Sequence, residues 1–542
     1  MAIARLLCAF CAFFPLYADA ALNVDLSSRA SIKSAAKLIA QNLMSYYHGD
    51  EPGQTPGILP GPPPAGDYYW WEGGALWGTM IDYWSSTSDD TYNPRTIQSL
   101  IFQSNTPSDN YMPPNWTASL GNDDQGFWGM SALLAAELKF QNPPRTAPQW
   151  LTLAQGVFNT QAHRWDTTYC GGGLRWQIPL SNNGYNYKNS ISNAIFFNMA
   201  ARLARYTGNS TYAEWAARSW DWTAQKEHGG VGYIDERWNI FDGAHVETNC
   251  TDVNRAQFSY TAAIFLQGAG FMWDFSGKNL PVGGKLEVNG RPIERKEGDW
   301  GAQALWETRL LALANRTMGI FFPGGIMTEV SCELPDRVQC TTDMLSFKGY
   351  VHRFLAQTAQ IAPPVRDIIM PVLRTSARGM AKSCTAQGVC GFRWNTGKYD
   401  GHTGAGQQMN ALGALIGLLV DKGGNLPVTN STGGTSRGDA GAGGNPSDQA
   451  IGELAELGDK DRAGAAILTG VVLLSWLVVL GWMVSGINEG PKWVDEKALL
   501  FDKESQTSGK RPVETIMGNM KSVSFDTSGT RSADIRRPMS IV

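Results

Sequence analysis

The chain has 542 residues, with 45 lysines and arginines against 49 aspartates and glutamates, which gives a formal net charge of −4. This balance excludes a strongly basic nucleic-acid-binding surface as the main feature of the protein, and no nucleic-acid partner is expected. Hydrophobic residues make up 43% of the chain and charged residues 17%, a composition that allows a sizeable core and is typical of a secreted protein. The 20 Trp, 17 Tyr and 21 Phe fit either a large core or flat surfaces for a sugar.

Residues 1–20 have the pattern of a secretory signal peptide. Arg5 gives a basic start, residues 6–17 are apolar, and residues 18–20 form an A-x-A cleavage site. N-x-S/T sequons behind this leader predict N-glycans on a lumenal or extracellular domain. The asparagines of these sequons are Asn115, Asn209, Asn249, Asn315 and Asn430.

Two of the eight cysteines lie in the leader, which leaves six in an oxidising compartment and predicts three disulfides. Six cysteines allow about 15 connectivities. Short separations, and then elimination, favour the pairs Cys170–Cys250, Cys332–Cys340 and Cys384–Cys390. A zinc site is the alternative, but the cysteine spacings are not of the two-residue kind and the six histidines are scattered. No metal is therefore expected.

Apolar residues at i, i+3, i+4 and i+7 recur through residues 21–422 and predict an all-α domain. In the fourth expected helix, for example, Phe127, Met130, Leu134 and Leu138 share one face. Helices are expected near 28–47, 70–84, 95–104, 123–140, 147–163, 189–206, 210–226, 255–273, 301–318, 341–360, 364–382 and 404–421. These segments, taken as six helical hairpins, predict an (α/α)6 barrel. Strand signals are few, and the clearest is a small hairpin around 285–288.

Three further segments follow this domain. Residues 423–462 are rich in Gly, Ser and Thr and predict a flexible stalk. Residues 463–488 contain no charged side chain and are long enough to span a bilayer as one helix. Residues 489–542 lack sustained periodicity and predict a disordered cytoplasmic tail. The order predicts a type I single-pass protein of the plasma membrane or a secretory-pathway membrane, with its large domain extracellular or lumenal.

The segment NDDQGFWG, residues 122–129, is the most informative for chemistry. Acidic residues at a helix start are favoured by capping and by the helix dipole, so Asp123 and Asp124 have a purely structural interpretation. The alternative is a pair of catalytic carboxyls, one ionised and one protonated, because adjacent carboxylates repel and titrate apart. An acid at this position needs an apolar or carboxylate-rich cleft to keep its proton, and Phe127 and Trp128 could help to exclude water.

The longer segment NDDQGFWGMSALLAAE resembles the paired-aspartate motif of glycoside hydrolase family 76, the endo-α-1,6-mannanases, and especially the fungal cell-wall members. Five other segments are similar to motifs of the same family in the same order: 67–84, 189–216, 258–268, 347–355 and 390–415. The likeness covers roughly residues 30–420. Several long matches in the right order are specific, whereas an isolated Asp-Asp pair would not be.

The resemblance implies an (α/α)6 barrel and retaining hydrolysis or transglycosylation of α-1,6-mannosyl linkages without a cofactor. By this likeness Asp123 is the nucleophile and Asp124 the general acid/base. The implied substrate is mannan or a GPI glycan in fungal cell-wall assembly, with a wall glucan as a candidate acceptor, and a monomer is expected. Fungal members commonly finish in a GPI signal, but residues 489–542 follow the apolar run here, so such a signal is not expected.

Nine residues are candidates for contact with the sugar, and each has a structural alternative. The aromatic candidates could stack on mannose or fill the core: Trp71, Trp128 and Tyr260. The polar candidates could hydrogen-bond a sugar, cap a loop or join two helices: Glu72, Gln125, Asn193, Asp242, Asp400 and Gln407. Asp400 and Gln407 belong to a glycine-rich loop that enters the last helix, and both are expected to face the cleft.

Two other classes of protein remain open. One is a mannan-binding wall or adhesion protein with an idle site, which the intact aspartate pair disfavours. The other is an all-helical, metal-dependent enzyme of the terpene type, which the missing DDxxD pattern and the lumenal setting disfavour. The sequence contains no Walker A, HExxH, EF-hand or GxSxG pattern.

Overall fold

The computed structural model describes residues 21–224, 230–279, 285–288, 291–294, 301–334, 339–421, 426–443, 469–470 and 473–481. The chain divides into two compact units, Met1–Glu453 together with residue 542, and Leu454–Ile541. The first unit contains the predicted enzyme domain.

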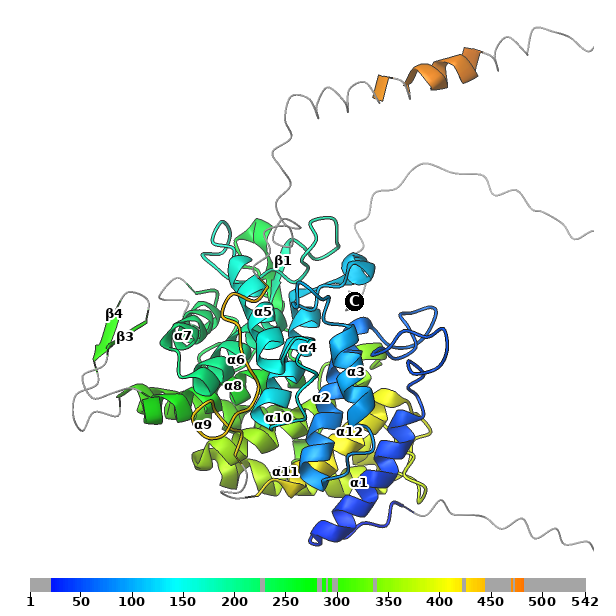
Figure 1. Cartoon of the computed structure of the whole chain (residues 1–542), viewed down its shortest axis with the longest axis vertical. Helices are drawn as coiled ribbons and strands as arrows, with labels where there is room; N and C mark the ends of the chain where they lie inside the picture. Colours follow the sequence, from blue (N-terminus) through cyan, green and yellow to red (C-terminus); the bar gives the residue numbers. More distant parts are fainter. Residues whose placement is uncertain are drawn as a thin grey trace, which may run out of the picture. The chain divides into compact units, whose positions relative to one another are not determined.

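Helices dominate the first unit, and the all-α prediction is confirmed (Figure 1). All the segments expected from periodicity are helical, most with ends shifted by only a few residues. The α-helices of the described part of this unit are α1 (Arg29–Met44), α2 (Trp70–Thr87), α3 (Asn93–Phe102), α4 (Asn122–Glu137), α5 (Trp150–His163), α6 (Ser190–Thr207), α7 (Ser210–Ala224), α8 (Ser259–Asn279), α9 (Gly301–Phe321), α10 (Phe347–Ile361), α11 (Arg366–Lys382) and α12 (Ala405–Ile416).

The even-numbered helices form a closed ring. Each contacts the next, from α2 through α4, α6, α8 and α10 to α12, and α12 contacts α2. The odd-numbered helices cover this ring, with α1 against α12, α3 against α2, α5 against α4, α7 against α6, α9 against α8 and α11 against α10.

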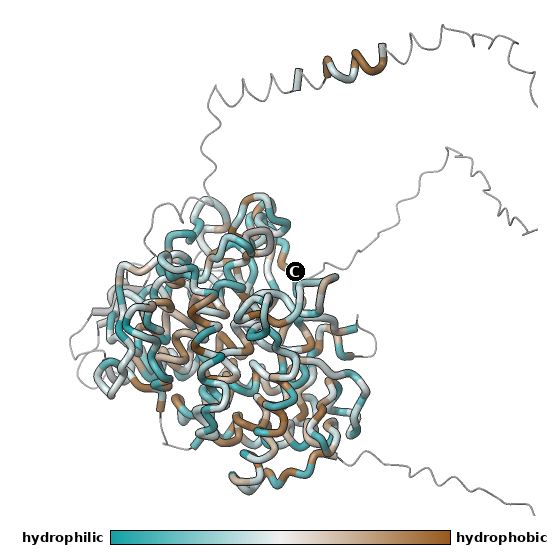
Figure 2. Tube along the Cα trace, turned by 45° about the vertical axis from the view of Figure 1, so that its right-hand side comes forward, coloured by the Kyte–Doolittle hydropathy of each residue, from teal (hydrophilic) through white to brown (hydrophobic). Residues whose placement is uncertain are grey.

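Burial separates the two kinds of helix. In α4 every residue except Asp123 is buried, and in α12 every residue is buried, as expected for helices surrounded by others. The outer helix α1 instead buries one stripe, spaced three and four residues apart. Figure 2 shows hydrophobic stretches among the helices of this unit and hydrophilic stretches in many of the connections.

The short strands lie outside the ring. β1 (Tyr187–Asn189) pairs antiparallel with β2 (Gly243–His245), and this pair brings the chain around Asp242 to the start of α6. There the backbone N–H of Ser190 donates to the carbonyl of Asp242 at 2.6 Å. β3 (Lys285–Val288) and β4 (Arg291–Glu294) form the hairpin predicted around 285–288, which is confirmed.

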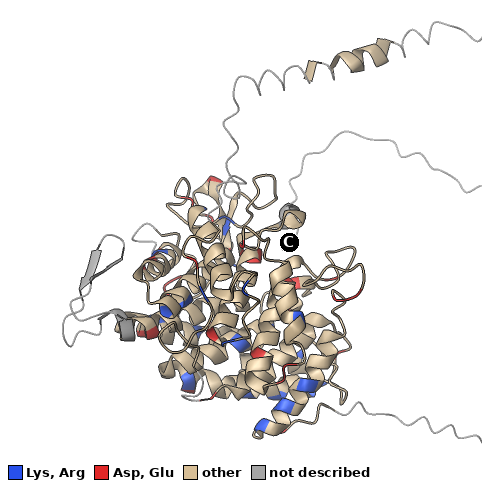
Figure 3. Cartoon of the chain, viewed as in Figure 1, with Lys and Arg blue, Asp and Glu red and all other residues tan. Residues whose placement is uncertain are grey.

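Buried ion pairs join some of the elements of the unit. Arg202 contacts Glu137 at 2.7 Å and joins α6 to α4, with both side chains at most 2% exposed. Lys348 of α10 contacts Glu333 at 2.8 Å and is fully buried. Elsewhere acidic and basic residues are scattered over the described helices, and most of the ribbon carries neither (Figure 3). Removing one member of such a buried pair costs about 3–5 kcal/mol, because the other charge is left uncompensated.

The three predicted disulfides are confirmed: Cys170–Cys250, Cys332–Cys340 and Cys384–Cys390. All five sequon asparagines are exposed. Their positions leave room for N-glycans, and glycosylation itself stays a prediction.

The flexible-stalk prediction is wrong for residues 426–443, which form a strap bound along the first unit. Arg205 donates to the carbonyl of Pro427 at 2.7 Å, and the N–H of Val428 donates to the carbonyl of Glu137 at 2.8 Å. Further along the strap, Asn159 of α5 donates to two strap carbonyls at 2.9 Å each. The stalk was predicted to be flexible because a segment rich in Gly, Ser and Thr has little apolar surface to bury. The strap is nevertheless bound, mainly through hydrogen bonds to its backbone.

In the second unit, residues 469–470 and 473–481 are helical, and most of residues 473–481 are apolar. Among the described residues, no helix has the length and hydrophobicity needed to cross a bilayer. The rest of the predicted span 463–488 lies outside the described residues, as do the leader 1–20, the tail 489–542 and residues 423–425 and 444–462 of the predicted stalk. Those assignments stay predictions.

Candidate active site

The candidate site lies where the ring helices begin. Ser192 in the first turn of α6 donates to Asp123 in the first turn of α4, and Tyr68, just before α2, accepts from the backbone of Ala405 in α12. Tyr260 in the first turn of α8 stacks on Phe347, the first residue of α10, with ring centroids 3.9 Å apart. The first turns of ring helices far apart in sequence therefore meet at one end of the ring.

Asp123 and Asp124 open α4, where Gly121 is the N-cap. The Gly121 N–H donates to Asp124 Oδ2 at 2.6 Å, so Asp124 caps the helix as the structural interpretation requires. The Ser192 hydroxyl donates to Asp123 Oδ1 at 3.2 Å. Each carboxyl thus has one oxygen held within the protein, and Asp123 is the partly exposed member of the pair.

Both carboxyls lie against Gly121. A Cβ at this position would stand 2.5 Å from Asp123 Oδ1 and 2.7 Å from Asp124 Oδ2. The separation between Asp123 Oδ1 and Asp124 Oδ2 therefore cannot exceed the sum of these two distances. Retaining glycosidases hold their two carboxyls about 5–5.5 Å apart. Glycine leaves room here that any other residue would fill.

Burial raises the pKa of both aspartates, to about 7 for Asp123 and well above the usual range for Asp124. For Asp124 the neighbouring charge of Asp123 adds to the effect of burial, whereas for Asp123 the Ser192 hydrogen bond opposes it. At neutral pH the pair keeps a proton, and Asp124 is the carboxyl that holds it. The acid-rich surroundings that the sequence required for a protonated aspartate are present.

Asp242 is a further carboxyl near the pair, as the sequence allowed. Its Oδ2 accepts from the Tyr187 hydroxyl at 2.7 Å and from the Asn254 amide at 3.1 Å. Its charge acts on Asp123 and raises the pKa of that carboxyl. Asp242 thus sits beside the nucleophile candidate with its own orientation fixed by two donors.

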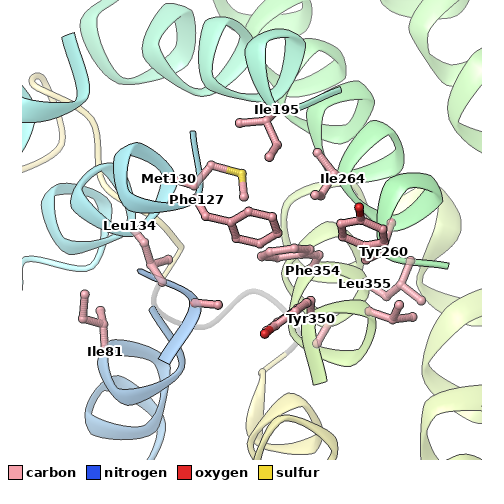
Figure 4. Close-up of a cluster of buried hydrophobic side chains, with 14 of the residues drawn as sticks. Ile81, Phe127, Met130, Leu134, Ile195, Tyr260, Ile264, Tyr350, Phe354 and Leu355 are labelled. Atoms are coloured by element: carbon pink, nitrogen blue, oxygen red, sulfur yellow. The ribbon is translucent and has the colours of Figure 1, made fainter. Parts of the chain in front are cut away.

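Aromatic side chains gather one helical turn after the aspartate pair, and Figure 4 shows Phe127, Tyr260 and Tyr350 in one buried cluster. Phe127 lies one turn after the pair and packs against Tyr260, Trp71 and Tyr350, with centroid separations of 6.3, 4.5 and 5.6 Å. Burial raises the pKa of Tyr260 well above its usual value, and the charges of Asp123 and Asp242 raise it further. Trp71 and Tyr260 therefore lie beside the candidate site, and their contact with a sugar stays a prediction.

Glu72 and Asp343 complete the acidic group. Glu72 is fully buried in the first turn of α2, and Asp343 is 4% exposed in the short 3-10 helix Thr342–Leu345 before α10. Burial raises the pKa of Asp343 to about 8, and the charge of Asp343 raises the pKa of Asp124. The sequence analysis missed Asp343. An acidic residue just before an aromatic-rich helix was the available signal, since Asp123 and Asp124 occupy a similar position.

Three residues predicted to contact the sugar are instead buried and make their contacts inside the protein: Gln125, Asn193 and Trp128. Gln125 is fully buried and donates to the carbonyl of Asn110 at 2.7 Å and to Thr160 at 3.0 Å, so both amide hydrogens are used inside the protein. Asn193 is fully buried, with its amide spent on the backbone of Leu174 and Asn189.

Trp128 is also fully buried, between Trp70 and Tyr111 with centroids 5.3 and 5.6 Å away. The structural alternative therefore accounts for Gln125, Asn193 and Trp128, and the sugar-contact assignment needs correcting at these three positions.

The last two candidates come from the loop before α12. Asp400 accepts from the backbone N–H groups of Phe392, Arg393 and His402, which makes it a loop clamp. Gln407 lies in the first turn of α12, next to Gly404 and the Tyr68 hydroxyl, at the same end of the ring as the aspartate pair. Contact of either residue with substrate stays a prediction.

Among the described residues, no group of three or more histidine, cysteine, aspartate or glutamate side chains is arranged to hold a metal ion.

The model of the family "Glycosyl hydrolase family 76" matches residues 31–431. The chain belongs to this family. It is 41% identical over 455 residues to the mannan endo-1,6-alpha-mannosidase DCW1 of Saccharomyces cerevisiae, covering 83% of this chain and 92% of that protein. The predicted family and the predicted glycoside hydrolase class are confirmed.

Solved structures of the family extend the likeness. Dfg5 of Chaetomium thermophilum, solved in complex with glucosamine, is 48% identical with a TM-score of 0.69 and matches 77% of this chain and 97% of its own. An inactive variant of the α-1,6-mannanase GH76A of Salegentibacter, with two consecutive aspartates replaced by asparagine, shares the fold at 16% identity. Its TM-score is 0.54, over 72% of this chain and 99% of its own.

Proposed function

We propose that this family 76 chain is a retaining endo-α-1,6-mannosidase or transglycosidase that acts on α-1,6-mannosyl linkages of mannan or a GPI glycan in fungal cell-wall assembly. The observation that carries the proposal is the pair Asp123–Asp124, held together against Gly121 with different proton affinities. The names of DCW1 and of the other curated fungal relatives support α-1,6-mannan as the substrate class. The closed double ring of helices supports an (α/α)6 barrel.

In the first step Asp124 donates its proton to the glycosidic oxygen while Asp123 attacks the anomeric carbon and forms a glycosyl-enzyme. In the second step Asp124, now ionised, takes a proton from water or from a sugar hydroxyl, which displaces Asp123. Water gives hydrolysis and a sugar hydroxyl gives transfer, with a wall glucan as the candidate acceptor.

The order of the two proton affinities supports this division of roles. Asp123 loses its proton at lower pH than Asp124, so the singly protonated pair has an ionised nucleophile and a protonated acid. The Ser192 hydroxyl stabilises the ionised form of Asp123. The reverse assignment would leave the attacking carboxyl with the more tightly held proton.

The test is product analysis with a defined α-1,6-mannooligosaccharide, with and without a glucan acceptor. We expect shortened α-configured products, a transfer product when the acceptor is present, and no turnover by Asp123→Asn or Asp124→Asn. Asp439→Asn, in the strap, is the matched control and should remain active. Inverted products would refute the retaining mechanism, and binding without turnover by the wild type would favour the mannan-binding alternative.

The location is part of the proposal. We propose a monomeric type I protein whose glycosylated enzyme domain faces the lumen or cell exterior and whose tail 489–542 is cytoplasmic. The sequence pattern of leader, apolar run and tail supports this arrangement, together with the exposed sequon asparagines. A tail epitope retained on the mature membrane protein is the expected result. Loss of the tail with gain of a phospholipase-sensitive anchor would overturn it.

A further inference from the structure

Gln177 is a buried polar residue beside the aspartate pair that the sequence analysis did not select. It lies between α5 and α6 and is 3% exposed. Asn182 donates to its Oε1 at 3.1 Å, whereas its Nε2 donates to no residue in the described part of the chain. Unlike the unpaired Glu72 Oε1, this nitrogen is not sealed inside the protein. Gln177 therefore has one end of its amide fixed and two N–H hydrogens available to a ligand.

The backbone places Gln177 directly opposite Gly121, with which it forms an antiparallel bridge. The Asn122 N–H donates to the carbonyl before Gln177 at 2.8 Å, and the Ile178 N–H donates to the carbonyl before Gly121 at 3.0 Å. These two flanking bonds make Gly121 and Gln177 a non-hydrogen-bonded pair, in which the Cα atoms lie about 4.5 Å apart and both side-chain positions project from the same face. A slip of one residue would turn Gln177 to the other face, and the flanking bonds exclude that slip.

The shared face is the one on which both aspartate carboxyls lie. A Cβ at Gly121 would stand 2.5 Å from Asp123 Oδ1 and 2.7 Å from Asp124 Oδ2. Opposite Cβ positions in such a pair are about 4.5–5.5 Å apart, so the Cβ of Gln177 lies within roughly 8 Å of both oxygens. Within the described residues, Gln177 forms a hydrogen bond with neither aspartate. Its amide thus remains available to a ligand that occupies the space over the carboxyls.

The chemistry of these groups selects a neutral ligand rich in hydroxyl groups. The ionised member of the aspartate pair repels an anion. An amide N–H needs an acceptor oxygen, whereas a carboxylate oxygen needs a donor. A sugar hydroxyl is both, so one ring bound over the pair can accept from Gln177 and donate to a carboxylate.

We propose that Gln177 is a substrate-binding residue whose Nε2 donates to a hydroxyl of the mannosyl ring bound over Asp123 and Asp124. The identity of the sugar rests on the proposed glycosidase function, whereas the position of the free amide rests on the bridge to Gly121. The amide takes no part in bond breaking. It holds the ring in the ground state and in the transition state alike, so its loss should appear mainly in KM.

Gln177→Met tests the contact, because methionine keeps the length of the side chain and has no hydrogen to donate. We expect kcat/KM on an α-1,6-mannooligosaccharide to fall about tenfold, mainly through KM. Gln155→Met is the matched control. Gln155 is 5% exposed, but its amide donates to the Tyr212 hydroxyl at 2.9 Å and accepts from the Asp439 N–H at 2.8 Å. This control should lose thermal stability and keep the wild-type kcat/KM. A purely structural role for Gln177 would give the same pattern in Gln177→Met and would overturn the proposal.

Substrates that each lack one hydroxyl of the mannosyl ring identify the bond from the other side. On the analogue without the contacted hydroxyl, wild type and Gln177→Met should have equal kcat/KM, while on the other analogues the variant should stay about tenfold lower. A tenfold deficit of the variant on every analogue would overturn the contact. The wild type alone should also lose about tenfold on that one analogue, which does not depend on the folding of any variant.

A binding measurement separates this contact from the proposed function. If the wild type turns over no α-1,6-mannan, the proposed glycosidase function fails, and calorimetry with α-1,6-mannotriose decides the contact. Gln177→Met should then bind the trisaccharide about tenfold more weakly than the wild type and Gln155→Met. Equal affinities, or no binding by any of the three proteins, would overturn the assignment of Gln177.

Discussion

Ser192→Ala tests the role of Asp123 through a single hydrogen bond. The serine is fully buried in the first turn of α6, and its hydroxyl is 3.2 Å from Asp123 Oδ1. Only an ionised Asp123 can attack the anomeric carbon. The hydroxyl stabilises that ionised form and so holds the pKa of Asp123 below the value that burial alone would give.

The size of the effect follows from the bond. A hydrogen bond to a charged group contributes about 1.5–3 kcal/mol, and a separation of 3.2 Å favours the lower end. One pKa unit corresponds to about 1.36 kcal/mol, so removing the hydroxyl should raise the pKa of Asp123 by about one unit. Below that pKa the ionised fraction, and with it kcat/KM, should fall about tenfold, while kcat/KM above pH 8 should change little.

The assay is kcat/KM against pH on an α-1,6-mannooligosaccharide. Ser219→Ala is the matched control, because this buried serine also makes a 3.2 Å hydrogen bond, but to the neutral carbonyl of Asn193. Its acid limb should coincide with that of the wild type. An acid limb in Ser192→Ala that does not move, or that moves equally in Ser219→Ala, would contradict the assignment of Asp123 as the nucleophile.

Three further outcomes are expected. Burial raises the pKa of Asp123 in the folded state, so the native protein binds a proton there that the unfolded chain releases, and wild-type stability falls as pH rises from about 4 to 8. Asp123→Asn removes this ionisation. Its thermal midpoint should therefore exceed that of the wild type at pH 8 but not at pH 4. Gly121→Ala should lower kcat about a hundredfold, because its Cβ would displace both carboxyls, while Gly319→Ala, with open space around it, should leave kcat unchanged; equal kcat in the two would contradict the spacing argument. Asn159→Ala removes two hydrogen bonds to the strap and should cost about 2 kcal/mol in urea unfolding, and no loss would mean that the strap does not stabilise the domain.

The helices were predictable because amphipathic periodicity survives in the outer layer and because the ring helices are long apolar runs. The aspartate pair was predictable because both carboxyls lie in one segment, at a helix start with a strong family likeness. The short-range disulfides followed from separations that leave the chain little choice. In each case the deciding information was local in sequence.

Non-local contacts account for what the sequence did not reveal. Asp343 belongs to the acidic group because its charge acts on Asp124, which stands far earlier in the chain. Gln125 directly follows the aspartates, yet successive helix positions are rotated by about 100°, so it faces α5 and not the site. The strap is held by backbone groups, and backbone hydrogen bonds leave no trace in composition.

The gathering of ring-helix starts at one end has an electrostatic consequence for the acid group. A helix N-terminus carries about half a positive elementary charge on its unpaired N–H groups. Several such ends face a set of carboxyls for which the described lysines and arginines provide no ion pair. The backbone N–H groups at these helix starts thus supply positive charge to the acidic group. They would do so whatever side chains the surrounding loops carried.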